Sequence, residues 1–140
     1  MRFKKINIQK IVNNNLDYLL TDLNKTKNKF ILSISGGIDS IVLLDIILKI
    51  KQKRIINLSL FHMNYGMHLN SDKMENLCIK IANKNKIEIF TKKINSKNLF
   101  KNTNIEAKAR YARYEELSSI CLKNKINYIL TAHHEDDQIE

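Results

Sequence analysis

Hydrophobic residues follow two patterns along the chain: short continuous runs, and longer segments in which they recur every three or four positions. The short runs predict buried β-strands, and the spaced segments predict amphipathic helices. Strands are expected at residues 30–34, 54–61, 87–91 and 126–132. Helices are expected at residues 6–23, 39–50, 71–85 and 104–124, and another begins within residues 133–140. Because strand and helix alternate strictly, the pattern predicts an α/β fold, a parallel sheet with helices on both faces.

Composition narrows the class of protein. The 140 residues are about the size of one domain, and 44% of them are hydrophobic, which is enough for a real core. The absence of Pro and the presence of only three Gly exclude collagen-like and Pro-rich chains. No apolar run reaches the ~18 residues of a membrane helix and no signal peptide is visible, so we expect no membrane partner. The cysteines Cys78 and Cys121 form no CxxC motif, which favours a reducing, cytoplasmic setting.

The formal net charge of +10 and the isoelectric point of about 9.6 favour a nucleic-acid or phosphate partner. The Lys residues are scattered along the chain instead of forming one stripe, and the abundance of Lys, Asn and Ile is also what an AT-rich coding bias produces. The charge therefore raises the expectation of an RNA partner without deciding it.

The loop after the first expected strand reads Ser35-Gly36-Gly37-Ile38-Asp39-Ser40. A Gly-Gly pair permits backbone torsions that let main-chain N–H groups converge on an anion, and the helix that follows adds the positive end of its dipole. The two serine hydroxyls are further donors, so the loop is a candidate pocket for phosphate oxygens. A carboxylate at Asp39 fits this pocket if a divalent cation bridges it to phosphate, or if it caps the helix. The alternative is a plain turn with a helix cap.

Two further segments follow expected strands, at the edge where parallel sheets bind ligands. His62 and Asn64, in a loop expected at residues 62–70, offer hydrogen bonds to a base or ribose, although a lone His in such a loop is more often structural. The segment after the fourth strand carries two His and four acidic residues. It fits catalytic carboxylates near Mg²⁺, an acidic helix N-terminus, or a divalent-metal site using His133, His134, Asp136 or Asp137. We expect the first and fourth strands to be neighbours, so that this segment faces the glycine loop.

The long helix expected at residues 104–124 carries three charged residues on one face, because spacings of four and three separate Glu106, Arg110 and Arg113. Either Glu106 and Arg110 form a surface ion pair, or an arginine of this face reaches a phosphate.

Four segments together resemble a known family: S-G-G-I-D-S at 35–40, H-M-N-Y-G at 62–66, N-I-E-A-K-A-R-Y-A-R-Y at 104–114 and L-T-A-H-H-E-D-D-Q-I-E at 130–140. They are similar, in matching order, to the PP-loop ATP pyrophosphatases, and in particular to the N-terminal domain of the tRNA(Ile)-lysidine synthetases. The resemblance implies a three-layer Rossmann-like fold of the adenine nucleotide alpha hydrolase type. Residues 1–140 would form an N-terminal PP-loop ATP-binding domain that is incomplete at its C-terminal end.

The activity implied by the resemblance is that of a ligase that forms a carbon–nitrogen bond. ATP adenylates the wobble cytidine of an isoleucine tRNA, and the side-chain amine of L-lysine then displaces AMP to give lysidine. The implied cofactors are ATP and Mg²⁺, and the implied partners are tRNA(Ile) and L-lysine. A cytoplasmic location and a homodimer are also expected from the resemblance.

The same resemblance assigns roles to individual residues. The loop that binds the ATP phosphates would consist of Ser35, Gly36, Gly37, Ile38, Asp39 and Ser40. The adenosine would lie near His62 and Asn64. The catalytic residues would be Asp39, Arg113 and Asp137. Mg²⁺ would be held by Asp39 and Asp136, and the ammonium group of the incoming lysine by Glu140.

The chain departs from the family pattern at two positions: Tyr65 stands where His is usual, and His68 stands where Arg is common, which removes a fixed positive charge. Two other functions stay open. One is another ATP pyrophosphatase, such as a tRNA thiolase or an amidotransferase-linked synthetase, and the other is a non-catalytic nucleotide-binding remnant.

Overall fold

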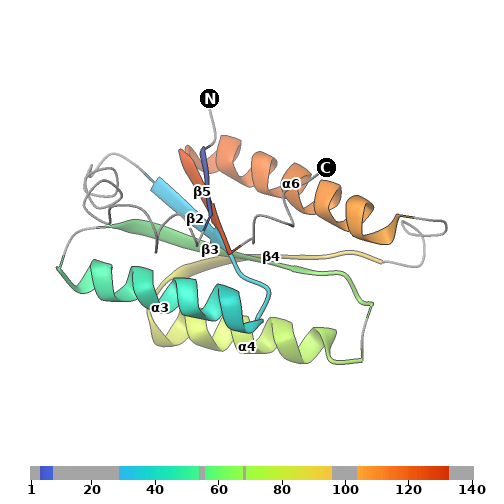
Figure 1. Ribbon diagram of the computed structural model, residues 1–140, viewed down its shortest axis with the longest axis horizontal. Coiled ribbons are helices and arrows are strands. Elements are labelled where there is room, and N and C mark those ends of the chain that lie inside the picture. Colours follow the sequence, from blue (N-terminus) through green and yellow to red (C-terminus); the bar gives the residue numbers. More distant parts are fainter. Residues whose placement is uncertain (1–3, 8–28, 54–55, 68, 96–103, 133–140) are drawn as a thin grey trace.

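The computed structural model describes residues 4–7, 29–53, 56–67, 69–95 and 104–132. Within these residues the chain forms five strands and three helices. The strands are β1 (Lys4–Asn7), β2 (Lys29–Ser33), β3 (Asn57–Asn64), β4 (Glu88–Lys93) and β5 (Tyr128–Thr131). The helices are α3 (Ile38–Lys53), α4 (Ser71–Lys84) and α6 (Ile105–Asn124). These strands run parallel in one sheet with the order β1-β5-β2-β3-β4 (Figure 1).

The sheet is the middle of three layers, in which α3 and α4 cover one face and α6 covers the other (Figure 1). Successive residues of β2 point to opposite faces, as the two-residue repeat of a strand requires. Phe30 and Leu32 pack into one cluster with α3 and α4, whereas Ile31 packs into a second cluster with α6. Because all three side chains are buried, this strand is a continuous apolar run in the sequence. The predicted α/β fold with helices on both faces is confirmed.

The helix α6 packs one stripe of its surface against the sheet, through Ala109, Leu117, Ile120 and Cys121. It ends at a left-handed residue, Lys125, which has a φ of 56° and donates its backbone N–H to the Cys121 carbonyl. The buried stripe fixes how the helix is rotated about its own axis, and so fixes which side chains face the carboxyl edge of the sheet.

The prediction of a helix from residue 6 is wrong at its start. Lys4–Asn7 form the strand β1, which pairs in parallel with all four residues of β5. Pairing with a strand that is distant in the sequence overrides the local helical periodicity here, as tertiary context commonly does. The rest of the expected helix, up to residue 23, lies outside the described residues.

The strand β3 starts and ends three residues later than the expected range of 54–61. His62 and Asn64 therefore lie within the strand, and the prediction that they belong to the following loop is wrong. The physical reason is the ladder with β4, which continues as far as Asn64 and gives these polar residues regular backbone partners.

The strand order reverses at β2. From β2 the chain moves to β3 and β4 on one side, and it then returns through α6 to β5 on the other side. Ser33 and Thr131 are register partners at the carboxyl ends of β2 and β5. The expected adjacency of these two strands is confirmed, and parallel sheets bind ligands at such a switch point.

Candidate phosphate-binding site

The turn from β2 into α3 depends on glycine at position 36. Gly36 has a φ of +86°, a left-handed torsion that residues with a side chain rarely adopt. A Cβ at this position would lie 2.5 Å from Cε of Met74, which α4 places directly beside the loop. Gly37 does not have this torsion, and a Cβ there would lie 3.2 Å from Oγ of Ser35. The backbone path and the packing of α4 therefore both require Gly36.

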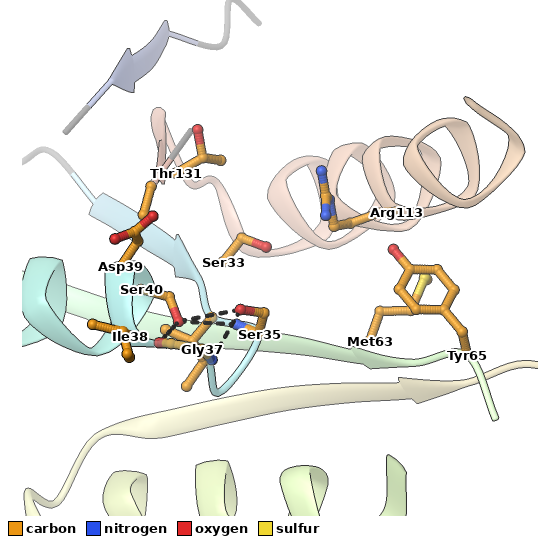
Figure 2. Close-up of a pocket in the computed structure, with 12 residues that line it drawn as sticks. Ser33, Ser35, Gly37, Ile38, Asp39, Ser40, Met63, Tyr65, Arg113 and Thr131 are labelled. Carbon is orange, nitrogen blue, oxygen red and sulfur yellow. Dashed lines mark hydrogen bonds between the residues drawn. The ribbon is translucent and has the colours of Figure 1, made fainter. Parts of the chain in front are cut away.

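Two serine hydroxyls hold the loop in shape, as the dashed lines in Figure 2 show. The buried Ser40 hydroxyl donates to the Gly37 carbonyl at 3.0 Å and accepts from the Ser35 backbone N–H at 3.3 Å. The Ser35 hydroxyl accepts from the Gly37 N–H at 3.1 Å and lies 3.4 Å from the Ser40 hydroxyl. The loop is therefore formed before any ligand arrives.

The loop ends in the positive end of a helix dipole. The Gly37 carbonyl accepts from the Ile41 N–H at 3.2 Å, which starts the hydrogen-bond ladder of α3. The first-turn N–H groups of a helix have no partner within the helix, and together with the dipole they favour an anion. Ile38 is 82% exposed and Asp39 is exposed, so this helix start is open to solvent.

A cavity of about 270 Å³ lies between the loop and α6 (Figure 2). We call it the switch-point cavity. The ends of β2 and β5 line it with Ser33 and Thr131, and α6 contributes Arg113. Its remaining lining residues come from the loop and its flanks, from the end of β3 and from the residue after β5: Ile34, Ser35, Gly37, Ile38, Asp39, Ser40, Met63, Tyr65 and Ala132. The cavity thus joins the helix start to a cationic side chain from the opposite layer.

Arg113 and Tyr65 both line this cavity on the side opposite the loop, and the Tyr65 hydroxyl is directed toward Arg113 (Figure 2). The Tyr65 hydroxyl donates to the Ala109 carbonyl of α6 at 3.2 Å. Burial raises the pKa of Tyr65, while the charge of Arg113 and its hydrogen bond with the phenol act in the opposite direction. Since the pKa stays above its ordinary value of 10.0, the phenol is neutral at physiological pH. The Arg113 guanidinium carbon also lies 5.3 Å from the ring centroid of Tyr114.

A second cavity, of about 550 Å³, lies where α4 begins. We call it the α4 cavity. It shares Ser35, Met63 and Tyr65 with the switch-point cavity, and it is otherwise lined by His62, Asn64, Met67, Asn70, Ser71 and Met74. Its wall is largely apolar, and one edge of it is the glycine loop.

His62 and Asn64 are both buried, with exposed fractions of 4% and 1%, and both are hydrogen-bonded within the protein. The His62 Nδ1 atom lies 2.8 Å from the Ile34 carbonyl oxygen, so Nδ1 carries the proton, because a carbonyl can only accept. Asn64 donates to Asp72 at 2.9 Å and accepts from the Gly66 N–H at 2.9 Å. His62 therefore supports the entrance to the glycine loop, and Asn64 supports the turn after β3.

The sequence model of the PP-loop domain matches residues 5–140. The chain belongs to the PP-loop family. Curated relatives include the tRNA(Ile)-lysidine synthase of Buchnera aphidicola subsp. Schizaphis graminum, which is 45% identical over 115 residues. That match covers 81% of this chain and 25% of the relative. The enzyme of the same name from Buchnera aphidicola subsp. Acyrthosiphon pisum is 39% identical over 119 residues, covering 84% of this chain and 26% of the relative. The chain thus spans about a quarter of the length of these relatives.

Among solved structures, the fold is similar to that of the U34-tRNA thiolase NcsA from Methanococcus maripaludis, which contains a [4Fe-4S] cluster. The TM-score is 0.71 and the sequence identity is 18%, over 83% of this chain and 41% of the other. This likeness supports the Rossmann-like PP-loop fold.

The structure brings together some of the residues predicted for the site. The PP-loop, residues 35–40, and Arg113 meet at the switch-point cavity, whereas Arg110 does not line it and Glu106 is exposed. His62 and Asn64 line the α4 cavity next to the PP-loop. The predicted residues that lie outside the described part of the chain are His68, His133, His134, Asp136, Asp137 and Glu140.

Three residues that shape the site were not anticipated from the sequence. Met74 packs against the PP-loop glycine, Tyr65 joins β3 to α6, and Thr131 ends β5 at the cavity. Among the described residues, the buried Thr131 hydroxyl has no hydrogen-bond partner. Periodicity marks Met74 and Thr131 only as helix and strand positions. The departure of Tyr65 from the family pattern was the one available signal.

The described residues fit Mg²⁺ only in part. No group of three or more His, Cys, Asp or Glu side chains that could hold a metal occurs among them. Among the residues that the structure describes, Asp39 is the one carboxylate that lines the switch-point cavity. Mg²⁺ commonly takes one or two carboxylates and completes its octahedron with substrate phosphates and water, so a single carboxylate beside a phosphate cradle is compatible with it. Over the same part of the chain, no helix is long and apolar enough to cross a bilayer.

Proposed function

We propose that this chain carries the ATP-activating site of a tRNA(Ile)-lysidine synthetase, a ligase that joins L-lysine to the wobble cytidine of an isoleucine tRNA. The observation that carries the proposal is the switch-point cavity, in which the PP-loop, Arg113 and the ends of β2 and β5 share one space. The names of the curated relatives support the same activity. The net charge of +10 is suited to a polyanionic substrate such as tRNA.

The proposed reaction has two steps. In the first, the exocyclic oxygen of the cytidine attacks the α-phosphorus of ATP, and the bond to pyrophosphate breaks. In the second, the side-chain amine of lysine attacks the activated ring carbon, loses a proton, and expels AMP. Both steps build negative charge on phosphate oxygens, so donors and cations fixed beside the phosphates lower both barriers.

The described residues take the following roles in this proposal. The N–H groups at the start of α3 and the Ser35 hydroxyl bind phosphate oxygens, and Ser40, whose hydroxyl donates to the Gly37 carbonyl, contributes by holding the loop in its binding shape. Arg113, from the opposite wall of the cavity, neutralises charge that develops at the α-phosphate. Asp39 would hold Mg²⁺, which supplies positive charge between phosphate oxygens when bound. The adenosine would occupy the α4 cavity, beside His62 and Asn64.

The remaining assignments concern residues outside the described part of the chain. We propose Asp137 as a catalytic carboxylate, Asp136 as a second Mg²⁺ ligand, and Glu140 as the partner of the lysine ammonium. Their support is that β5 ends at the switch-point cavity with Thr131 and Ala132, so the chain leaves the sheet at the site. The homodimer and the cytoplasmic setting stay predictions.

Isothermal titration with ATP and Mg²⁺ on the full chain tests the nucleotide site. Asp39→Asn is the test variant, and Asp45→Asn is a matched control, because Asp45 lies on the same helix and is paired with Lys49 at 3.0 Å. We expect Asp39→Asn to weaken Mg²⁺-dependent ATP binding at least about tenfold, as loss of a direct metal ligand does, and Asp45→Asn to leave it unchanged. Failure of the unaltered chain to bind ATP would refute the proposal.

Incorporation of labelled lysine into a tRNA(Ile) transcript tests the reaction itself. ATP-dependent incorporation that is lost in Asp39→Asn supports the ligase. ATP binding with neither lysine incorporation nor ATP–pyrophosphate exchange in the presence of tRNA would instead identify a nucleotide-binding module.

A further inference from the structure

Among the described residues that line both cavities, Tyr65 is the one whose side chain also connects the sheet to α6 by a hydrogen bond. It is the first residue after β3, and its ring packs against the cluster that α6 forms with the sheet. Its hydroxyl donates to the Ala109 carbonyl at 3.2 Å. The Tyr65 side chain therefore links the end of β3, in the middle layer, to α6 in one outer layer.

Arg113 follows Ala109 by four residues, so it lies on the same face of α6, and it lines the switch-point cavity together with Tyr65. Burial raises the pKa of the phenol, and the charge of Arg113 and its hydrogen bonding lower that pKa against the effect of burial, as expected for a guanidinium beside the phenol oxygen. Figure 2 shows the hydroxyl directed toward α6 and Arg113. A phenol oxygen has one proton to donate and lone pairs to accept with. Because the phenol proton is donated to the Ala109 carbonyl, only the lone pairs of the oxygen are left for Arg113. The guanidinium must therefore approach the phenol oxygen as a donor, from the side of those lone pairs.

We propose that Tyr65 is a positioning residue that holds the Arg113 guanidinium at the wall of the switch-point cavity, facing the PP-loop, before substrate binds. The effect of this positioning on phosphate binding rests on the proposed function. The positioning itself is a property of the ligand-free chain. An arginine side chain has many rotamers, and ordering it in advance removes that entropy cost from the binding step.

Arg113 is supported from a second side as well, because its guanidinium carbon lies 5.3 Å from the Tyr114 ring centroid. This contact lies within α6 and restricts the side chain locally. Tyr65 adds a contact between Arg113 and the sheet, at the carboxyl end of β3. That end of β3 also lines the α4 cavity. An imidazole at position 65, which the family pattern has, is shorter than a phenol and would not reach the Ala109 carbonyl in the same way.

The test uses Tyr65→Phe, which keeps the ring and removes only the hydroxyl, with Tyr111→Phe as the matched control. Tyr111 lies on α6 and is 72% exposed. The first readout is the hydrogen-exchange rate of the Arg113 Nη protons in the ligand-free chain, measured at low temperature and assigned by their loss in Arg113→Lys. We expect Tyr65→Phe to raise that rate about fivefold, the effect of losing one hydrogen bond, and Tyr111→Phe to leave it unchanged. An unchanged rate in Tyr65→Phe would overturn the proposal.

The second readout is the affinity for inorganic pyrophosphate, measured in a double-mutant cycle with Arg113→Gln. Tyr65→Phe should weaken binding about fivefold in the unaltered chain and by less than about twofold in the Arg113→Gln background, because its effect passes through Arg113. The same factor in both backgrounds would show that Tyr65 acts independently and would overturn the proposal. If the unaltered chain bound neither pyrophosphate nor ATP, the proposed function would fail, and the exchange measurement would still decide the positioning role.

Discussion

Replacing Gly36 with Ala tests whether the PP-loop depends on a left-handed residue packed against α4. Two costs follow from the structure. A φ of +86° is strained for Ala by about 1–2 kcal/mol. The new Cβ would lie 2.5 Å from Met74 Cε, and since that atom ends a flexible side chain, displacing it into a poorer rotamer adds about 1 kcal/mol.

Reduced freedom of the unfolded chain offsets part of these costs, by about 0.4–1 kcal/mol. The expected net loss is about 1–2.5 kcal/mol in the free energy of unfolding, a fall in Tm of roughly 3–9 °C for a domain of this length. The measurement is urea unfolding followed by circular dichroism, with thermal unfolding alongside. Gly37→Ala is the control, because Gly37 has no left-handed torsion and should change stability by less than about 1 kcal/mol.

A third variant separates the two costs. In a Met74→Ala background the contact with the new Cβ is gone, so Gly36→Ala should cost about 1 kcal/mol less than it does beside Met74. Equal unfolding free energies for Gly36→Ala and the unaltered chain, within about 0.3 kcal/mol, would refute the reasoning from torsion and contact together.

Three further predictions concern other parts of the site. Ser40→Ala removes a buried hydroxyl that bonds to Ser35 and Gly37, and we expect a loss of about 1–2 kcal/mol in unfolding free energy, measured in urea. Burial raises the pKa of the Cys78 thiol to about 11. Iodoacetamide at pH 8 should therefore label Cys78 far more slowly in the folded chain than in urea, because the thiolate is the reactive form. Equal labelling rates would contradict the burial of Cys78. Hydrogen bonds from Lys93, and then from Asn64, hold the pKa of Asp72 below its ordinary 3.8. Because the pKa of Asp72 is lower in the folded chain than in the unfolded chain, the stabilisation is present at neutral pH and is lost as the pH falls through the folded pKa. Carbon-detected NMR titration measures the pKa of Asp72, and we expect it to be higher in Lys93→Met than in the unaltered chain.

The layers of the fold and the PP-loop could be predicted because their signals are local. The run at residues 30–34 is apolar throughout since both faces of β2 are buried, and the glycine pair follows it directly. The strand β1 gave no such signal, because its sequence is too short to show periodicity and its partner β5 lies more than a hundred residues away. Predicting it needed knowledge of the pairing.

The ends of β3 and the wall of the site could not be predicted for a different reason. His62 and Asn64 are polar residues whose burial is stabilised by Ile34 and Asp72, contacts that no pattern of hydrophobicity records. Arg113 could be picked out by its helical spacing, whereas its contact with Tyr65 depends on how α6 crosses the sheet. Long-range hydrogen bonds, more than local propensity, decide these features.

The position of β5 between β1 and β2 bears on how the protein is made. During synthesis β2, β3 and β4 leave the ribosome before β5, and they can pair while one edge of β2 is still unpaired. An open strand edge is prone to capture by other chains, and contacts between residues far apart in the sequence form slowly. Only when residues 128–131 emerge can the centre of the sheet close, so the switch-point cavity cannot take shape before β5 has been made.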